Sequence, residues 1–255
     1  MVRVWLILAV LLAGTAWGQA PAYSAANIVN ASDYSPGPFA PNSVLSIFGT
    51  NLSWDIEQVS PNQGPSVILP TVDSVQVYVD NWPAPVLYAS GPQVNFIVPG
   101  NEISGDITVR VVREGVTGPE VTLTLAAAAP ALFALSTGYI VATHADGSLI
   151  TANSPANAGE TVVVYATGLG QTEPNPSPGE IPQTAASIVL FDSLSVSLDG
   201  AALPAYLIKY AGVTPQSIAL YQINIELPAT LGENPQIQVT VGTQSSLPGL
   251  KINVQ

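Results

Sequence analysis

The chain repeats itself. The segment Asp73–Asp80 alternates apolar and polar residues and runs into a turn, and Asp192–Asp199 does the same. Alternation with a period of two is typical of a β-strand with one buried face. Further blocks recur in the same order: Val44–Leu52 with Thr161–Leu169, Gln93–Pro99 with Gln222–Pro228, Ile107–Val111 with Ile237–Val241, and Val121–Leu125 with Leu250–Val254. Five blocks in one order predict that the chain is two copies of one domain.

The repeat also indicates the fold class. Each copy holds about six or seven strand-like segments separated by Gly, Pro, Asn and Asp turns, without a convincing amphipathic helix. This pattern predicts an all-β protein, two tandem immunoglobulin-like antiparallel β-sandwiches. The predicted boundary is Ala126–Pro130, where a proline after four alanines favours an extended connector. The predicted organisation is a signal peptide (1–18), an N-terminal linker (19–26), a first domain (27–126) and a second domain (127–255).

The two copies differ mainly in their predicted loops. The first copy has a Pro/Gly-rich excursion from Ser53 to Pro70, and Gln171–Thr184 is its counterpart in the second copy. The second copy has an additional insertion, predicted over Tyr210–Leu220. Long loops at the ends of a sandwich are where such domains carry binding sites.

The N-terminus and the charge restrict the compartment and the partners. Arg3, the apolar run Val4–Ala13 and the small residues around Trp17 form a secretory signal peptide, too short for a permanent membrane anchor. The protein is therefore predicted to be secreted or cell-surface, with no permanent membrane span in the mature chain. With five Lys and Arg, a formal net charge of −12 and no cysteine, it has no basic stripe for nucleic acid and no thiolate chemistry.

Several phrases of the sequence resemble a known family. They are "IVNASDYSPGPFAPNSVLSIFGTNL", "PAPVLYASGPQVNFIVP", "AAAAPALF", "ETVVVYATGLG" and "LYQINIELP". From about Asn27 to Gln255 the chain resembles the Solibacter-type C-terminal domain family of secreted bacterial proteins, and its opening is similar to IPT/TIG immunoglobulin-like domains. The resemblance implies a secreted β-sandwich and supplies no catalytic residues. The chain departs from the family by standing alone after its signal peptide and by Asn42, where the family often has glycine.

The sequence predicts no catalytic residue, no metal site and no cofactor. His144 is the single histidine, so it lacks the partners that a triad or zinc site needs, and we interpret it as a hairpin residue before Asp146-Gly147. The closest carboxylate pairs, Asp55 with Glu57 and Glu173 with Glu180, lie in predicted loops. No calcium-binding loop sequence is present.

Aromatic residues supply the candidate ligand-binding residues Trp82, Trp54 and Tyr88. After removal of the signal peptide two tryptophans remain, both at predicted loop or turn positions. An exposed indole can stack on a sugar or anchor an interface, but it can also cover the end of its own sandwich. The repeated Gln93/Asn95 and Gln222/Asn224 pairs fall on one strand face. They can line a polar patch or bond to neighbouring strands, and their recurrence favours the structural role.

These observations predict a non-catalytic interaction or structural module rather than an enzyme, with an unknown protein or a polysaccharide as partner. The alternative is a carbohydrate-binding protein that uses the exposed aromatics of the first domain. An enzyme of unknown type is the remote alternative.

Overall fold

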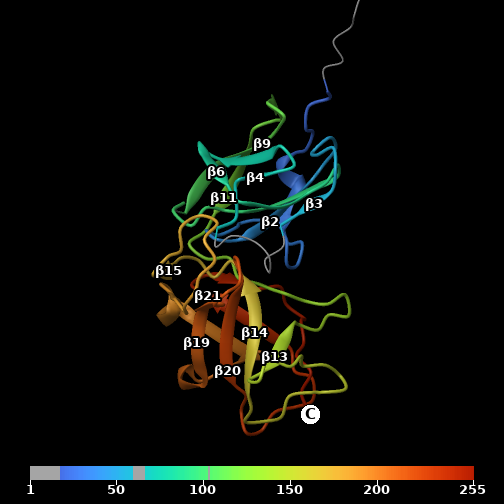
Figure 1. Cartoon of the computed structure of the whole chain (residues 1–255). Coiled ribbons are helices and arrows are strands. Elements are labelled where there is room, and N and C mark those ends of the chain that lie inside the picture. The colour runs from blue at the N-terminus through green and yellow to red at the C-terminus, as the bar shows by residue number, and fades with distance from the viewer. Residues whose placement is uncertain (1–17, 60–66, 103) are drawn as a thin grey trace, which may run out of the picture.

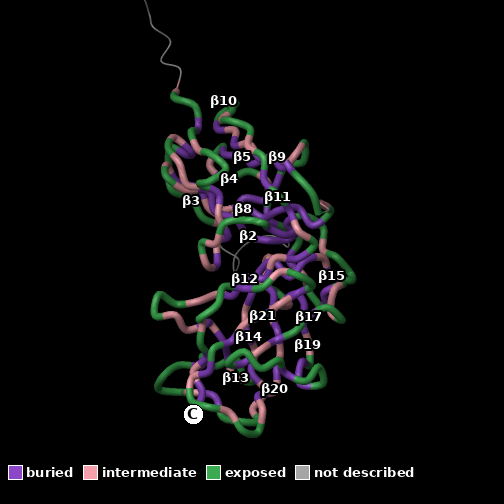
Figure 2. The backbone as a smooth tube through the Cα atoms, turned by 180° about the vertical axis from the view of Figure 1, so that it is seen from behind, coloured by how far each residue is buried: buried purple, intermediate pink, exposed green. Residues whose placement is uncertain are grey.

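The structure is a computed structural model that describes residues 18–59, 67–102 and 104–255. Two β-sandwiches are stacked end to end, and the chain enters at the far end of the first and finishes at the far end of the second (Figure 1). Their buried residues form two separate cores, one from Ile28 to Leu125 and one from Ala128 to Val254 (Figure 2). The predicted signal peptide lies outside the described residues except for Gly18.

The first sandwich pairs two antiparallel sheets. One has the order β1 (Ile28–Asn30), β2 (Val44–Phe48), β8 (Gln93–Ile97), β7 (Val86–Ala89), β3 (Glu57–Gln58). The other has the order β10 (Val116–Thr117), β9 (Gly105–Arg113), β5 (Val75–Val79), β4 (Thr71–Val72), with β11 (Val121–Leu125) also on β9 and β6 (Trp82–Ala84) on β5. The paths β1-β2-β8-β7 and β5-β9-β11 are the ABED and CFG sheets of an immunoglobulin domain.

The second sandwich repeats this topology. Its larger sheet has the order β12 (Ala131–Leu132), β14 (Thr161–Thr167), β20 (Tyr221–Glu226), β19 (Ile208–Val213), β16 (Ser187–Ile188), β15 (Thr172–Glu173), with β13 (Ala142–His144) on β14. Its smaller sheet has the order β18 (Ala201–Ala202), β17 (Leu194–Leu198), β21 (Ile237–Val241), β22 (Gln244–Ser245). The predicted all-β immunoglobulin-like fold is confirmed.

Helix is confined to short 3-10 turns in the part of the chain that the structure describes: η1 (Ala25–Asn27), η2 (Phe191–Ser193) and η3 (Ala205–Leu207). None of the helices found there has the length and apolarity to cross a bilayer.

The repeated aspartates explain how the central strands end. In β5 and β17 alternate residues are buried, as the period-two pattern predicts. Asp80 and Asp199 then adopt positive φ angles of 50° and 48°, which turn the chain. Each carboxylate accepts a backbone N–H of the neighbouring segment, from Thr108 at 2.8 Å and from Gln236 at 2.9 Å. The same side chain therefore performs the same structural task in both copies.

Two sequence-based assignments need correction. The insertion predicted over Tyr210–Leu220 is shorter, because Tyr210–Val213 belongs to β19, the counterpart of β7, and the added loop is 214–220. Leu250–Val254, predicted to match β11, runs beside its neighbours through isolated bridges such as Tyr139–Lys251 rather than as a ladder.

Both loop excursions add strands to the same edge. In the first sandwich β3 pairs with β7. In the second, β15 of the excursion pairs with β16, and Ser187 of β16 pairs with Gly212 of β19. The sheet that holds β1 in the first sandwich and β12 in the second is thereby widened beyond its fourth strand.

Candidate functional site

Trp54 lies at the end of the first sandwich farther from the second. Its ring covers the Arg113 guanidinium, whose Cζ is 3.8 Å from the ring centroid, and its Nε1 donates to Glu114 Oε2 at 2.9 Å. Arg113 is 1% exposed and donates to the backbone oxygens of Asn51 and Gln19. Although Trp54 is 55% exposed, this position gives it a structural task.

Trp82 lies at the opposite end of β5. It begins β6 directly after the Asp80-Asn81 turn and pairs with Val79, whereas Arg113 pairs with Val75. Its side chain is 61% exposed and makes no hydrogen bond to any residue that the structure describes. Trp54 and Trp82 are therefore not brought together.

Tyr88 lies on the other sheet and faces outward. It pairs with Asn95 on one side and with Gln58 on the other, while the adjacent Ala89 points into the core. Phe48 pairs with Gln93, which lies two residues from Asn95 along β8 and therefore on the same face. We call this set (Phe48, Gln58, Tyr88, Gln93, Asn95) the Tyr88 face.

Two amides of the Tyr88 face, those of Gln93 and Asn95, are held in place by hydrogen bonds. Asn95 Oδ1 accepts hydrogen bonds from Gln93 Nε2 at 2.8 Å and from Ser46 Oγ at 2.9 Å. Tyr34, 63% exposed, extends the surface, with its ring 6.1 Å from the Phe48 ring. Phe48, Tyr88, Gln93 and Asn95 are all partly exposed. The result is an uncharged surface of aromatic rings and oriented amides.

The second sandwich carries an equivalent set with different contacts. Tyr165 pairs with Gln222, as Phe48 pairs with Gln93 in the first sandwich. Asn224 pairs with Tyr210, as Asn95 pairs with Tyr88. Gln222 Nε2 donates to Asn224 Oδ1 at 3.0 Å, which repeats the amide bond of the first sandwich. The Tyr210 hydroxyl, however, lies within hydrogen-bond distance of the carbonyls of Val213 (2.8 Å) and Ala186 (3.1 Å).

Sequence reasoning found only part of this surface. It named Tyr88 as a candidate and treated the Gln-x-Asn pairs as probable structural features, but it did not connect them. Phe48, Gln58 and Tyr34 were missed, because only the strand register and the loop before β2 bring them beside Gln93 and Tyr88. The recurrence of Leu87-Tyr88-Ala89 as Lys209-Tyr210-Ala211 was the available signal.

The single histidine is engaged in a loop contact. His144 Nδ1 lies 2.5 Å from Glu160 Oε1, and its Nε2 lies 3.2 Å from both the carbonyl oxygen and the Oγ of Ser154. The fold therefore brings a carboxylate and a hydroxyl beside the histidine, although the sequence predicted that it lacks such partners. The hydrogen bond with Glu160 raises the pKa of His144 despite the opposing effect of burial. Burial raises the pKa of Glu160, but hydrogen bonds from the Asn157 N–H and from His144 outweigh it, so that the pKa lies below its usual value.

Of the predicted carboxylate pairs, the Glu180 carboxylate has a structural partner: its Oε2 accepts the Ser177 N–H at 3.0 Å. The contact of Asp55 is made by its backbone, whose N–H donates to Asp73 Oδ2 at 3.1 Å. Burial, with the nearby Asp80 carboxylate, raises the pKa of Glu102. Among the described residues, no cluster of three or more His, Cys, Asp or Glu side chains could hold a metal ion.

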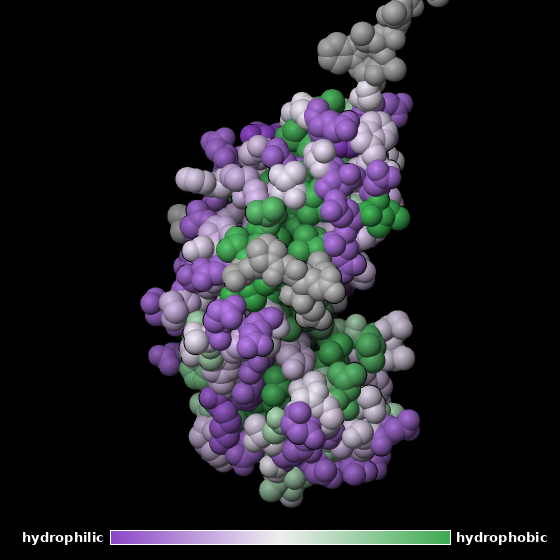
Figure 3. Space-filling view, in the orientation of Figure 1, coloured by the Kyte–Doolittle hydropathy of each residue, from purple (hydrophilic) through white to green (hydrophobic). Residues whose placement is uncertain are grey.

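The two sandwiches meet in a hydrogen-bonded junction. The Gly100 carbonyl accepts Gln171 Nε2 at 2.7 Å and Asn175 Nδ2 at 3.0 Å, and Asn42 Nδ2 donates to Asn175 Oδ1 at 3.1 Å. The Ile68 N–H donates to the Gly179 carbonyl at 2.7 Å. Hydrophobic side chains gather at the level where the sandwiches meet (Figure 3).

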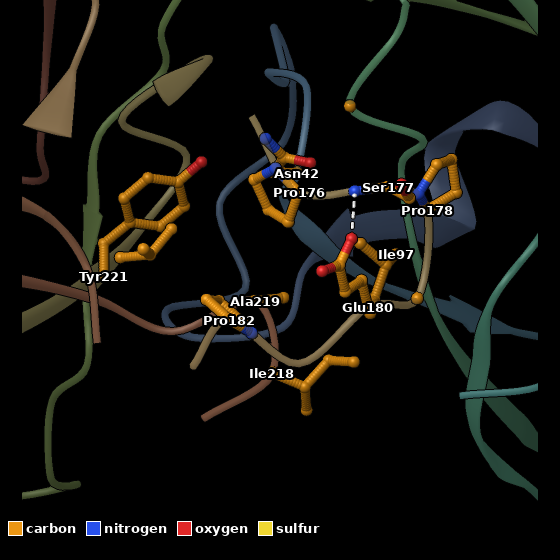
Figure 4. Close-up of a pocket in the computed structure, with 13 residues that line it drawn as sticks. Asn42, Ile97, Pro176, Ser177, Pro178, Glu180, Pro182, Ile218, Ala219 and Tyr221 are labelled. Carbon is orange, nitrogen blue, oxygen red and sulfur yellow. Dashed lines mark hydrogen bonds between the residues drawn. The ribbon is translucent and has the colours of Figure 1, made fainter. Parts of the chain in front are cut away.

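A small cavity lies inside this junction. Asn42 and Ile97 come from the first sandwich, and the proline-rich loop 176–182 and Tyr221 come from the second (Figure 4). Its volume is about 20 Å³, enough for about one water. Burial raises the pKa of Tyr221, whose hydroxyl donates to the Gly170 carbonyl. This cavity is therefore too small to hold a ligand larger than water. A wider hollow of about 190 Å³ at the same junction is lined by Pro41, Glu102 and Gln171 among others.

No protein-family model matches the chain, and no curated protein matches it in sequence. Among solved structures it is similar to SGBP-B from a complex xyloglucan utilization locus in Bacteroides uniformis, at 10% identity and a TM-score of 0.27, over 91% of this chain and 49% of that one. It is also similar to SGBP-B of the Bacteroides ovatus mixed-linkage glucan utilization locus, at 9% identity and a TM-score of 0.33, over 85% of this chain and 41% of that one. Its similarity to the tandem Ig repeats of Dlar has 12% identity and a TM-score of 0.21, over 85% of this chain and 91% of that one. The chain spans less than half of either Bacteroides protein, and likeness this weak carries no inference about function.

Proposed function

We propose that this chain is an exported, non-catalytic binding protein whose first sandwich carries the ligand surface. The observation that carries the proposal is the Tyr88 face, where aromatic rings lie beside amides already fixed by hydrogen bonds. Rigid aromatic side chains bind ligands at a low cost in conformational entropy, and oriented amides add directional hydrogen bonds. A sugar chain offers both the apolar ring face and the hydroxyl groups that such a surface fits.

The engagement of the reactive groups supports the proposal that the protein is non-catalytic. His144 Nδ1 contacts Glu160, and its Nε2 lies 3.2 Å from both the Oγ and the carbonyl oxygen of Ser154. The raised pKa of His144 favours the imidazolium, which donates from both nitrogens and is then no base for the Ser154 hydroxyl. The carboxylate of Asp80, whose charge helps to raise the pKa of Glu102, accepts two hydrogen bonds from Thr108 and thereby caps the end of β5. General acid–base catalysis by two carboxylates needs both groups at the substrate.

A titration tests the proposal. Residues 19–255 are titrated with soluble plant and microbial polysaccharides by calorimetry and by intrinsic fluorescence, which reports on Trp54 and Trp82. Saturable binding that is lost in Tyr88→Ala or in Trp82→Ala supports a binding surface on the first sandwich. Absence of binding to every polysaccharide, or binding that survives both substitutions together, would contradict it.

A structural spacer is the second candidate, and the junction favours it. Four interdomain hydrogen bonds through Gly100, Asn42 and Ile68 hold the sandwiches in one orientation. A spacer requires a constant distance between its ends. Fluorophores placed at both ends should give one narrow distance distribution by single-molecule energy transfer, and a broad distribution would contradict the spacer.

A further inference from the structure

We propose that the ligand of the Tyr88 face is a neutral, extended polysaccharide that crosses the strands β8, β7 and β3. This inference rests on the proposed function and specifies its ligand class. It follows from the register of the strands, the hydrogen-bonding state of the amides, the charge of the surface and the comparison of the two copies.

The register places the contacts in a straight row. Asn95, Tyr88 and Gln58 are directly paired across three neighbouring strands. Neighbouring strands lie about 4.8 Å apart, a spacing close to the length of one sugar unit in an extended chain. Gln93 and Phe48 form a second row beside the first. An extended glycan running perpendicular to the strands therefore meets an amide or an aromatic ring at each step.

Hydrogen bonding leaves specific groups for the ligand. Asn95 Oδ1 already accepts from Ser46 and Gln93, which fixes the amide and turns its Nδ2 group away from these partners. That Nδ2 group and the Tyr88 hydroxyl make no hydrogen bond to any other side chain or backbone group of the described residues. Both can bond to sugar hydroxyls without first breaking an internal contact.

Charge favours a neutral ligand. None of the five residues of the Tyr88 face is an Asp, Glu, Lys, Arg or His, and the whole chain carries a formal net charge of −12. The two arginines of the first sandwich are engaged on the other sheet, Arg110 with Glu120 and Arg113 beneath Trp54. Long-range repulsion therefore opposes a polyanionic glycan, and no cation on this surface compensates for it.

The second sandwich shows why one site per chain is expected. Its Tyr210 hydroxyl is taken by the carbonyls of Val213 and Ala186, and a Cβ on Gly212 would lie 2.7 Å from the Tyr210 ring. The Tyr210 ring thus packs closely along β19. Tyr165, the counterpart of Phe48, has its hydroxyl 3.3 Å from Thr143 Oγ1. The tyrosine hydroxyls of the second copy are therefore engaged internally, whereas the Tyr88 hydroxyl of the first copy is not engaged by any described residue.

Calorimetry with defined oligosaccharides tests the inference on residues 19–255. Cellohexaose represents a neutral extended chain, maltohexaose a neutral curved chain, and hexagalacturonate an anionic chain. We expect one cellohexaose per protein and weaker binding of the other two. Asn95→Ala should weaken cellohexaose binding about tenfold, the loss of one well-placed polar contact, and Tyr88→Ala should weaken it further.

The internal repeat supplies a matched control. Asn224→Ala removes the Gln–Asn side-chain bond of the second sandwich, and it should leave cellohexaose binding unchanged. Asn95→Ala also removes the bond from Ser46, so the stability of both variants is measured beside their binding. Equal loss in Asn95→Ala and Asn224→Ala, two molecules of cellohexaose per protein, or preference for hexagalacturonate would each overturn the inference. Polysaccharide binding that needs Trp82 but not Asn95 would overturn it while leaving the proposed function intact. Absence of all binding would overturn both.

Discussion

The indole of Trp54 covers the guanidinium of Arg113, whose Cζ lies 3.8 Å from the ring centroid. Arg113 ends β9, is 1% exposed and donates to the carbonyls of Asn51 and Gln19. One buried cation therefore ties the N-terminal segment and the loop after β2 to the end of β9. The tryptophan keeps water from the guanidinium and contributes a cation–π interaction.

Trp54→Ala should destabilise the first sandwich by about 1–2 kcal/mol, because it removes the cation–π interaction and exposes Arg113. Trp82→Ala is the matched control, since Trp82 is 61% exposed and Trp54 55%, but Trp82 covers no charge. Urea denaturation followed by circular dichroism measures both changes. Equal free energies of unfolding for the two variants would show that the Arg113 contact contributes nothing.

The paired tyrosines allow a second test of stability. Tyr210→Phe should lower the free energy of unfolding by about 1 kcal/mol, because the hydroxyl that faces the Val213 and Ala186 carbonyls is lost. Tyr88→Phe should change it by less than about 0.5 kcal/mol, because the hydroxyl of Tyr88 is not bonded to a described residue. The denaturation midpoints of both variants are compared with that of the wild type. A larger loss of stability in Tyr88→Phe than in Tyr210→Phe would contradict the assignment of the Tyr88 hydroxyl as the one without an internal hydrogen bond.

The period-two pattern and the internal repeat were sufficient to predict two immunoglobulin-like sandwiches, because burial alternates along the strands as the sequence does. The relation of Trp54 to Arg113 was not predictable, since the two residues belong to segments that only the folded sheet brings together. Tyr210 was assigned to an insertion because the irregular register of β19 and the loop 214–220 shift the alignment of the two copies. Tyr88 and the Gln-x-Asn pairs were visible in the sequence, but their side-by-side position depends on strand register.

Gly100→Ala should loosen the junction between the sandwiches. An added Cβ would clash with the side chain of Asn42 and lie 2.9 Å from Asn175 Nδ2, so these two side chains must shift and the hydrogen bonds that they make across the junction are disturbed. Small-angle X-ray scattering should show a broader distribution of end-to-end distances in this variant. Gly91→Ala is the control, because its added Cβ meets only the Ser53 carbonyl at 3.6 Å. An unchanged scattering profile for Gly100→Ala would show that the junction does not set the orientation.

The His144–Glu160 contact should make the stability of the second sandwich depend on pH. Because the pKa of His144 is raised on folding, the contact contributes its full stability below pH 6.5 and loses it as the pH rises through the folded-state pKa. Because the pKa of Glu160 is lowered on folding, the contact contributes its full stability above pH 4.5 and loses it as the pH falls through the folded-state pKa. The difference in unfolding free energy between wild type and His144→Gln should therefore be largest between pH 4.5 and 6.5 and should fall toward pH 9. Denaturation at pH 5.5 and pH 9 measures it, and Glu160→Gln should show the same trend. A difference that grows with pH would refute the assignment.

In each sandwich a segment near the entry of the chain runs parallel to a segment near its exit. Phe39 forms a parallel bridge with Leu125, and Tyr139 forms one with Lys251. Since the described ends of the chain lie at opposite ends of the molecule (Figure 1), tension applied between them pulls the two parallel segments of a sandwich in opposite directions. The hydrogen bonds between such segments are then sheared together instead of being unzipped one after another. Resistance to stretching is thus a property of how each sandwich is threaded, independent of any ligand.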